Sequence, residues 1–305
     1  MTLSPLGITK LSSMPSLKLL LLKAAFKKSS YDVHNSSSVS LPEDRFYFDG
    51  VNLDESIYQN FHQVVGWESD FIHPCYLHSL AFVLHVKLLL LAKFPFPLLG
   101  LVHVNNQIRQ LRPINKGEKL AVSSCFGQLE LHPKGWMFSI KVEFYSGSEL
   151  VWQGISTNLF RTNHGQDVEK IDSHSTETFT NPINKTWILS SNLGRRYAKV
   201  SGDYNPIHLT NWSAKLFGFK QHIIHGMCTK SYCISDLQKI NPTLFLQAYE
   251  VKTTFKQPLY LPNQVNLAIQ PSMSETCTDS MLFKVEGASV NNQQPLHLIG
   301  NIRSI

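Results

Sequence analysis

The sequence lacks any Cys-x-x-Cys pair and has an odd number of cysteines, five in 305 residues. A disulfide framework uses an even number of cysteines and zinc sites commonly use closely spaced pairs, so neither is indicated. Cysteines without this pattern are typical of a reducing compartment, and we therefore expect a cytoplasmic protein. The cysteines are Cys75, Cys125, Cys228, Cys233 and Cys277.

Acidic residues are missing from the first 31 positions, where five lysines precede Asp32. The formal charge of the chain is +6, so most of the excess lies on this short segment and the remainder is nearly neutral. Binding to a phosphate backbone needs basic side chains spread along one face. The charge distribution therefore predicts no nucleic-acid partner.

No apolar run is both long and free of interruption. The stretch 81–101 contains two lysines and two prolines, and lysines are costly inside a bilayer, so we predict a buried core helix there. The segment Ser16–Lys28 (SLKLLLLKAAFKK) allows two interpretations. It is favoured as a helix docked on the protein's own surface with its lysines outward, and peripheral contact with an anionic membrane or an acidic carrier protein is the alternative.

The two halves of the chain show the same order of predicted elements, namely a strand, a short helix, a long apolar helix and four strands. Aligning Pro113 with Pro258 also aligns three apolar positions at the same offset, which indicates a duplication. The first-half ranges are 45–51, 54–65, a helix from 73, and strands at 100–111, 118–130, 136–145 and 149–160. The second-half ranges are 186–190, 193–200, 225–237, and strands at 247–257, 263–271, 280–290 and 295–303.

An apolar helix and an antiparallel sheet with one apolar face each need a partner to cover that face. We therefore predict an α+β fold in which two antiparallel sheets are each wrapped around a central helix and joined into one continuous sheet. The predicted boundaries are an N-terminal basic amphipathic segment at 1–40, a first unit at 41–162, a polar linker at 163–182 and a second unit at 183–305.

The halves differ between the short helix and the long one. The second half has 22 residues there, Asp203–Ile224, and the first half has six, Trp67–Ile72. Because binding and catalytic residues concentrate on loops held by a scaffold, we expect the chemistry in the longer loop.

Two turns are expected at the start of that loop. Gly202 permits one, and Asn205-Pro206 fixes the second because proline restricts its own φ and the preceding residue. The carboxylate of Asp203 and the imidazole of His208 are thus expected to face one small volume. An acid and a base held together can move the protons of water.

His225, Gly226 and Met227 open the long helix of the second half. Glycine allows a ligand close to the backbone, and the first-turn amides with the helix dipole stabilise a negative oxygen. We predict an oxyanion and substrate-binding site at these three residues. Each group taken alone is more typical of a structural role, Asp203 as a cap and His208 as a packed histidine. Only their combination favours a function.

The segment 197–214, YAKVSGDYNPIHLTNWSA, resembles the signature of the MaoC-like, or hydratase 2, family. That signature has a tyrosine, a short spacer, Ser-Gly-Asp-x-Asn-Pro, an aliphatic residue and a histidine, then five residues and a small one. The resemblance covers about residues 186 to 300, including 218–219, 224–227 and 254–259. It departs from the family at Pro262-Asn263, where relatives often carry Gly-Asp, and in the length of the first-half apolar helix. The positions that fill the signature are Tyr197, Ser201, Gly202, Asp203, Asn205, Pro206, Ile207, His208 and Ala214.

The resemblance implies a double hot-dog fold whose first unit is a degenerate partner, since Gly66-Trp67 stands where Gly202-Asp203 stands in the second. It also implies reversible hydration of trans-2-enoyl thioesters to (R)-3-hydroxyacyl thioesters in fatty acid metabolism. Asp203 and His208 would be the catalytic pair and Asn205 an orienting residue. The motif has no metal-ligand spacing, and no cofactor is implied.

Three alternatives remain open at this point. The carrier is either coenzyme A or acyl carrier protein, because Arg195, Arg196 and Lys199 could meet coenzyme phosphates or an acidic carrier helix. A thioesterase fits less well, since the loop belongs to water addition in the family it resembles. A non-catalytic acyl-thioester-binding subunit is the third. A homodimer is compatible with the fold, because hot-dog sheets often pair further.

Overall fold

The computed structural model describes residues 7–27, 39–98, 100–162, 179–271, 279–289 and 294–305. The described residues form two compact units, each assembled from separate stretches of sequence. Unit 1 is drawn from 1–52, 80–106 and 119–176, and unit 2 from 53–79, 107–118 and 177–305. Most of the predicted linker and Cys277 lie outside the described residues, and the domain boundaries stay a prediction.

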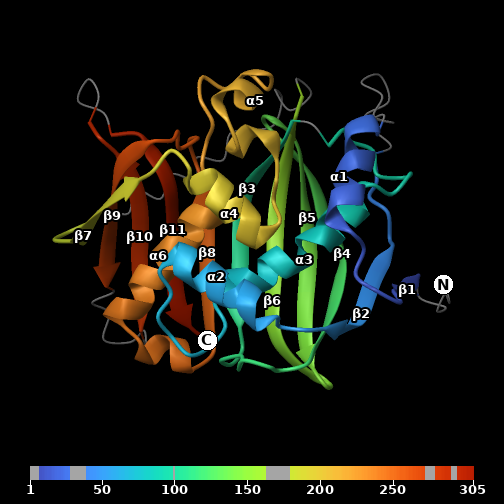
Figure 1. Cartoon of the computed structure of the whole chain (residues 1–305), viewed down its shortest axis with the longest axis horizontal. Helices are drawn as coiled ribbons and strands as arrows, with labels where there is room; N and C mark the ends of the chain where they lie inside the picture. Colours follow the sequence, from blue (N-terminus) through green and yellow to red (C-terminus); the bar gives the residue numbers. More distant parts are fainter. Residues whose placement is uncertain (1–6, 28–38, 99, 163–178, 272–278, 290–293) are drawn as a thin grey trace. The chain divides into compact units, whose positions relative to one another are not determined.

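Unit 1 is a strongly paired antiparallel meander (Figure 1). Its strand order is β1-β2-β4-β5-β6, with β1 parallel to β2 and the other neighbours antiparallel. The predicted alternation holds on β5, where Phe138, Ile140, Val142 and Phe144 are buried. The elements are β1 (Ile8–Lys10), α1 (Leu17–Phe26), β2 (Arg45–Val51), β4 (Leu120–His132), β5 (Gly135–Ser146), β6 (Glu149–Arg161), the later part of α3 (Pro74–Leu89) and the start of β3 (Leu101–Gln110).

The predicted core helix over 81–101 is correct only in its first part. Helix α3 ends at Leu89, because Pro95 and Pro97 and the residues before them cannot continue a helix. Phe94 and Phe96 lie beyond that end and are fully buried in an aromatic cluster. Phe94 stacks on Phe126 with 5.3 Å between ring centroids. These phenylalanines therefore serve packing.

Unit 2 combines a second antiparallel sheet with a central helix (Figure 1). Its strand order is β8-β11-β10-β9-β7, and α6 packs on β11 and also reaches β8, where the buried Lys230 donates to the Val251 carbonyl at 3.4 Å. The elements are α2 (Glu55–Val65), the first residues of α3, the end of β3, β7 (Ile183–Leu189), α4 (Leu193–Ser201), η3 (Pro206–His208), α5 (Asn211–Lys215), α6 (Gly226–Ile240), η4 (Thr243–Leu246), β8 (Tyr249–Phe255), β9 (Asn263–Pro271), β10 (Ser280–Gly287) and β11 (Leu296–Ser304).

Helices α2 and α4 contact each other within unit 2 and end in the same way. Gly66 caps α2 with φ 70° and Gly202 caps α4 with φ 79°. This left-handed conformation favours glycine, because it has no Cβ to clash. The predicted correspondence of Gly66-Trp67 with Gly202-Asp203 therefore extends to the backbone conformation.

Strand β8 departs from the predicted alternation at Glu250. The pattern places Glu250 on the outer face with Lys252, yet the residue is only 4% exposed. Arg303 donates to Glu250 Oε1 at 3.1 Å, and Gln107 donates to Oε2. A charged group is buried at low cost only where it is paired, and these partners come from other strands of unit 2 that the local pattern does not reveal.

Helix α1 is not amphipathic with all its lysines outward. The Lys27 ammonium, at its C-terminal end, donates to the carbonyls of Leu89, Leu91 and Phe94 at 2.5, 3.0 and 3.3 Å. It also lies 4.7 Å from the centroid of the Phe94 ring. Lys27 thus neutralises the carbonyls at the end of α3. No helix in the described ranges is long and apolar enough to cross a membrane.

Replacing Lys27 by alanine is expected to lower the free energy of unfolding by about 1–2 kcal/mol, because three carbonyls at a helix end lose a charged donor. Urea denaturation measures the change. Lys18→Ala, at an exposed position of the same helix, is the matched control and should stay within about 0.5 kcal/mol of the parent. Equal stability of the two variants would show that the Lys27 contacts contribute nothing.

Candidate active site

The long loop of unit 2 folds back twice on itself. Gly202 ends α4, Asn205 accepts from the Ile207 N–H at 3.4 Å to start the η3 turn, and Thr210 caps α5 by accepting from the Ser213 N–H at 3.1 Å. The end of the loop is held by His222, whose Nε2–H donates to the Ser191 carbonyl at 2.8 Å. Local side-chain acceptors therefore fix each bend.

The Asp203 carboxylate is held at the first bend. Its Oδ1 accepts from the Asn205 N–H at 3.1 Å, and its own N–H donates to Ser201 Oγ at 3.3 Å. The side chain remains 26% exposed. Desolvation raises the pKa of Asp203, against the opposing effects of His208 and of the Asn205 amide.

His208 is buried in the second bend. Its Nδ1–H donates to the Ile223 carbonyl at 2.8 Å, so the neutral ring keeps its lone pair on Nε2. Burial lowers the pKa of His208 to about 3, with the neighbouring His225 acting in the same direction. The imidazole is therefore neutral at ordinary pH and can accept a proton from a ligand.

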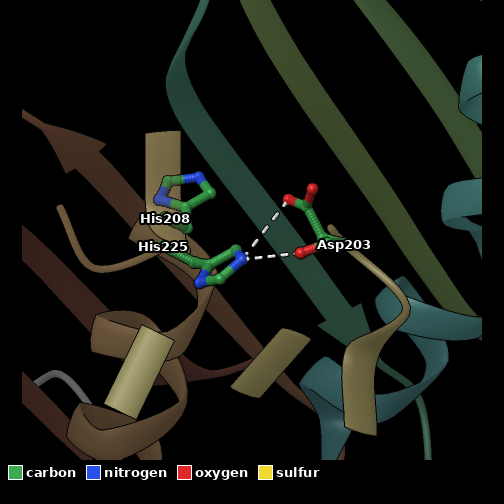
Figure 2. A group of neighbouring side chains, drawn as sticks. All are labelled: Asp203, His208 and His225. Carbon is green, nitrogen blue, oxygen red and sulfur yellow. Dashed lines mark hydrogen bonds and ion pairs between the residues drawn. The ribbon is translucent and has the colours of Figure 1, made fainter. Parts of the chain in front are cut away.

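His225 lies next to both Asp203 and His208, as Figure 2 shows. Its Nε2–H donates to the Asp203 backbone carbonyl at 2.9 Å and lies 4.0 Å from Asp203 Oδ2. Its ring stacks on His208 with centroids 3.7 Å apart and planes at 28°, and the buried Tyr197 ring lies 5.0 Å away on another side. Burial lowers the pKa of His225 to about 4. The His225 side chain therefore supports the loop from within.

Gly226 is the first residue of α6 and Met227 the second, with His225 as the N-cap. A Cβ at Gly226 would come within 3.0 Å of ring carbons of Phe255, tighter than an ordinary contact. Met227 is buried. The first-turn amides of a helix have no intrahelical acceptor, so the N–H groups here are suited to a developing negative charge.

Gly194 is a site residue that the sequence did not indicate. A Cβ built on it would lie 2.2 Å from the His208 carbonyl oxygen, so only glycine lets the η3 turn sit directly on α4. A glycine inside an otherwise good helix was the available signal, since it costs about 1 kcal/mol relative to alanine.

Asp203, His208 and His225 are close enough together to bind a metal ion as a group. Asp203, His208 and His225 each offer one atom, and all three atoms lie within 4.8 Å of one another. The sequence spacing did not predict this. However, His225 Nε2 already carries its proton toward the Asp203 carbonyl, and its lone pair is on Nδ1, which has no hydrogen-bond partner among the described residues. An ion here would have to displace that bond.

Comparisons with known proteins find similarity in the half of the chain that carries this loop. Residues 163–287 match the family model described as MaoC like domain. The chain is 28% identical over 176 residues to 3-hydroxyacyl-thioester dehydratase X of Mycobacterium tuberculosis, covering 58% of this chain and 61% of the relative, and thus less than two thirds of the relative's length.

Solved structures show the fold. The crystal structure of HtdX from Mycobacterium tuberculosis superposes with a TM-score of 0.70 at 22% identity, covering 86% of this chain and 100% of that one. A second protein of that organism, described as having a double hotdog fold, covers 88% of this chain and 97% of its own length with a TM-score of 0.56 at 10% identity. The α+β, double hot-dog prediction is confirmed by these structures, and residues 163–287 are similar to a MaoC-like domain.

Proposed function

We propose that the protein interconverts trans-2-enoyl and (R)-3-hydroxyacyl thioesters by adding or removing water at the Asp203–His208 pair. The observation that carries this proposal is the meeting of a carboxylate, a neutral imidazole and a helix N-terminus within one bent loop of unit 2. Proton transfer by a positioned pair and stabilisation of a developing enolate oxygen are the two requirements of water addition to a conjugated thioester.

In the hydration direction the thioester carbonyl accepts a hydrogen bond from the Gly226 N–H. Water bonds to C3, the π pair of the C2–C3 double bond forms the new C2–H bond, and charge develops on the carbonyl oxygen in between. The Asp203–His208 pair takes one proton from the water and returns one to C2, so its total protonation is unchanged after a turnover. Removing one oxyanion donor typically costs about 3 kcal/mol in the barrier.

The neutral His208 with its lone pair on Nε2 is suited to accept the water proton. Asp203 is held by Asn205 at the edge of the site, where it remains partly exposed and can hold the same water. Asn205 thereby acts as a positioning residue, and His225 holds the Asp203 backbone. Met227 contributes its amide to the first turn of α6.

The proposal includes the cellular context expected from the sequence, a cytoplasmic protein acting on an acyl-CoA or acyl-carrier-protein thioester in fatty acid metabolism. The dehydratase named among the relatives supports a thioester substrate. The exposed Leu19 and Leu22 on α1 keep peripheral membrane contact through the N-terminal segment as part of the proposal. A homodimer is a further part of it.

Asp203→Asn and His208→Gln are each expected to lower kcat for crotonyl-CoA hydration by about 10²- to 10⁴-fold, because each removes one proton-transfer group. A spectrophotometric assay follows loss of the ultraviolet absorbance of the conjugated enoyl thioester, and kcat is compared between the variants and the parent. Gln221→Ala, an exposed change on the same loop, should keep parental activity. Near-parental turnover in both active-site variants would overturn the proposed function.

Both buried imidazoles are expected to stay neutral between pH 8 and 5. Their pKa values are lowered by burial to about 3 for His208 and about 4 for His225, so protonation begins only as the pH falls below that interval. Histidine NMR with selective labels measures this, and His208→Gln assigns the signal. A titration of His208 with its midpoint near the ordinary value of about 6.5 would contradict the buried, neutral base.

Gly194→Ala is expected to lower kcat by about 10- to 100-fold, because the methyl group displaces the His208 carbonyl and with it the catalytic ring. The free energy of unfolding should also fall, by about 1–2 kcal/mol, because the clash is with backbone and the helix propensity of alanine offsets only part of it. Thermal unfolding and steady-state kinetics separate the two effects, with the exposed change Gln221→Ala as control. An unchanged kcat would show that the η3 turn adjusts without moving His208.

A further inference from the structure

Helix α4 leads directly into the loop that carries the site, and its exposed charged side chains are all basic. Arg195, Arg196 and Lys199 are exposed, whereas the residues between them, Tyr197 and Ala198, are buried. From Ser190 to Ser235 the sequence has one acidic residue, Asp203 itself. The surface of this segment therefore carries positive charge without local neutralisation, and it favours an anionic partner.

Helix α5 adds an apolar face to the same segment. Trp212 is 74% exposed and Leu216 is 66% exposed, with Phe217 beside them and Lys215 between them. Positions 212, 215 and 216 share one side of a helix because they are three and four residues apart. Exposed large apolar side chains with basic side chains near them are typical of a protein-binding surface.

Hydrogen bonds connect α4 and α5 to the η3 turn that contains His208. Arg195 Nη1 donates to the Leu209 carbonyl at 2.8 Å, directly after His208. Ser213 Oγ donates to the Pro206 carbonyl at 2.6 Å, which fixes α5 to the η3 turn. A partner seated on α4 and α5 would therefore be held next to the loop that contains Asp203 and His208.

We infer that Arg196, Lys199, Trp212, Lys215 and Leu216 form the docking surface for an acidic acyl carrier protein that delivers its thioester to the Asp203–His208 site. The inference rests on the proposed function and names the carrier for it. Coenzyme A is a small ligand whose phosphates could use the arginines but would leave the Trp212–Leu216 face uncovered. A carrier protein can cover both, with its acidic helix on the charged side chains and apolar residues on the indole.

The test compares one acyl group on two carriers. Wild-type protein and three variants (Arg196→Glu, Lys215→Glu and Trp212→Ser) are assayed for hydration of a crotonyl thioester on purified type II acyl carrier protein and on coenzyme A. Lys215→Glu is expected to reduce kcat/KM on the carrier protein by roughly five- to tenfold and to leave coenzyme A turnover within about twofold. Arg196→Glu, which removes a group that coenzyme phosphates could also use, is expected to lower kcat/KM more on the carrier protein than on coenzyme A. Raising the salt concentration should weaken the wild-type preference. Lys134→Glu, an exposed lysine in the β4–β5 turn of unit 1, is the matched control.

The outcomes separate the two proposals. Absence of wild-type turnover on both carriers contradicts the proposed function. Turnover on coenzyme A with carrier-protein kinetics unchanged in all three variants overturns the docking surface alone, as does an equal loss on both carriers, which would place these residues in the catalytic machinery. Sedimentation with anionic phosphatidylglycerol vesicles that depends on Trp212, with unaltered carrier-protein kinetics, would assign the surface to a membrane and overturn the inference.

Discussion

The site depends on one hydrogen bond, from the His225 imidazole to the backbone carbonyl of Asp203. It joins positions 22 residues apart in sequence, so the loop between them must close on itself before the carboxylate has a defined place. The bond also fixes the tautomer of His225 and orients the ring that stacks on His208. The bond is partly buried, and its loss is expected to cost about 1 kcal/mol.

The corresponding elements in the first half of the chain differ at the position that follows the glycine cap. Trp67 follows Gly66 at the end of α2, and His73 precedes α3 as His225 precedes α6. The Trp67 and His73 rings meet edge to face with centroids 4.6 Å apart. His73 Nδ1 accepts from the Cys75 N–H at 3.0 Å, so its polar atoms are used within the core. An indole thus fills the position that the carboxylate takes in the other copy.

The order of helices and strands and the bends of the site loop could be predicted from the sequence, because they depend on local residue patterns. The strand and helix order follows from periodicity, and the Gly202 and Asn205-Pro206 bends follow from backbone restrictions of single residues. What failed depends on distant partners. The burial of Glu250 requires Arg303 and Gln107, the inward Lys27 requires the end of α3, and the packing of Gly194 on the His208 carbonyl requires the folded loop. Of these, only Gly194 leaves a local signal, a glycine inside a helix, and that signal does not reveal its partner.

The assembly of unit 2 from separate stretches limits how the protein can be divided. Helix α2 lies before the second half of the chain in sequence, yet Phe61 on α2 packs against Tyr197 on α4 with ring centroids 5.7 Å apart. Tyr197 in turn lies against His225. A fragment that begins at residue 183 would therefore keep the whole signature and lose the apolar cover behind it. The motif alone is therefore not enough in this chain, because the packing behind it comes from residues far outside the motif.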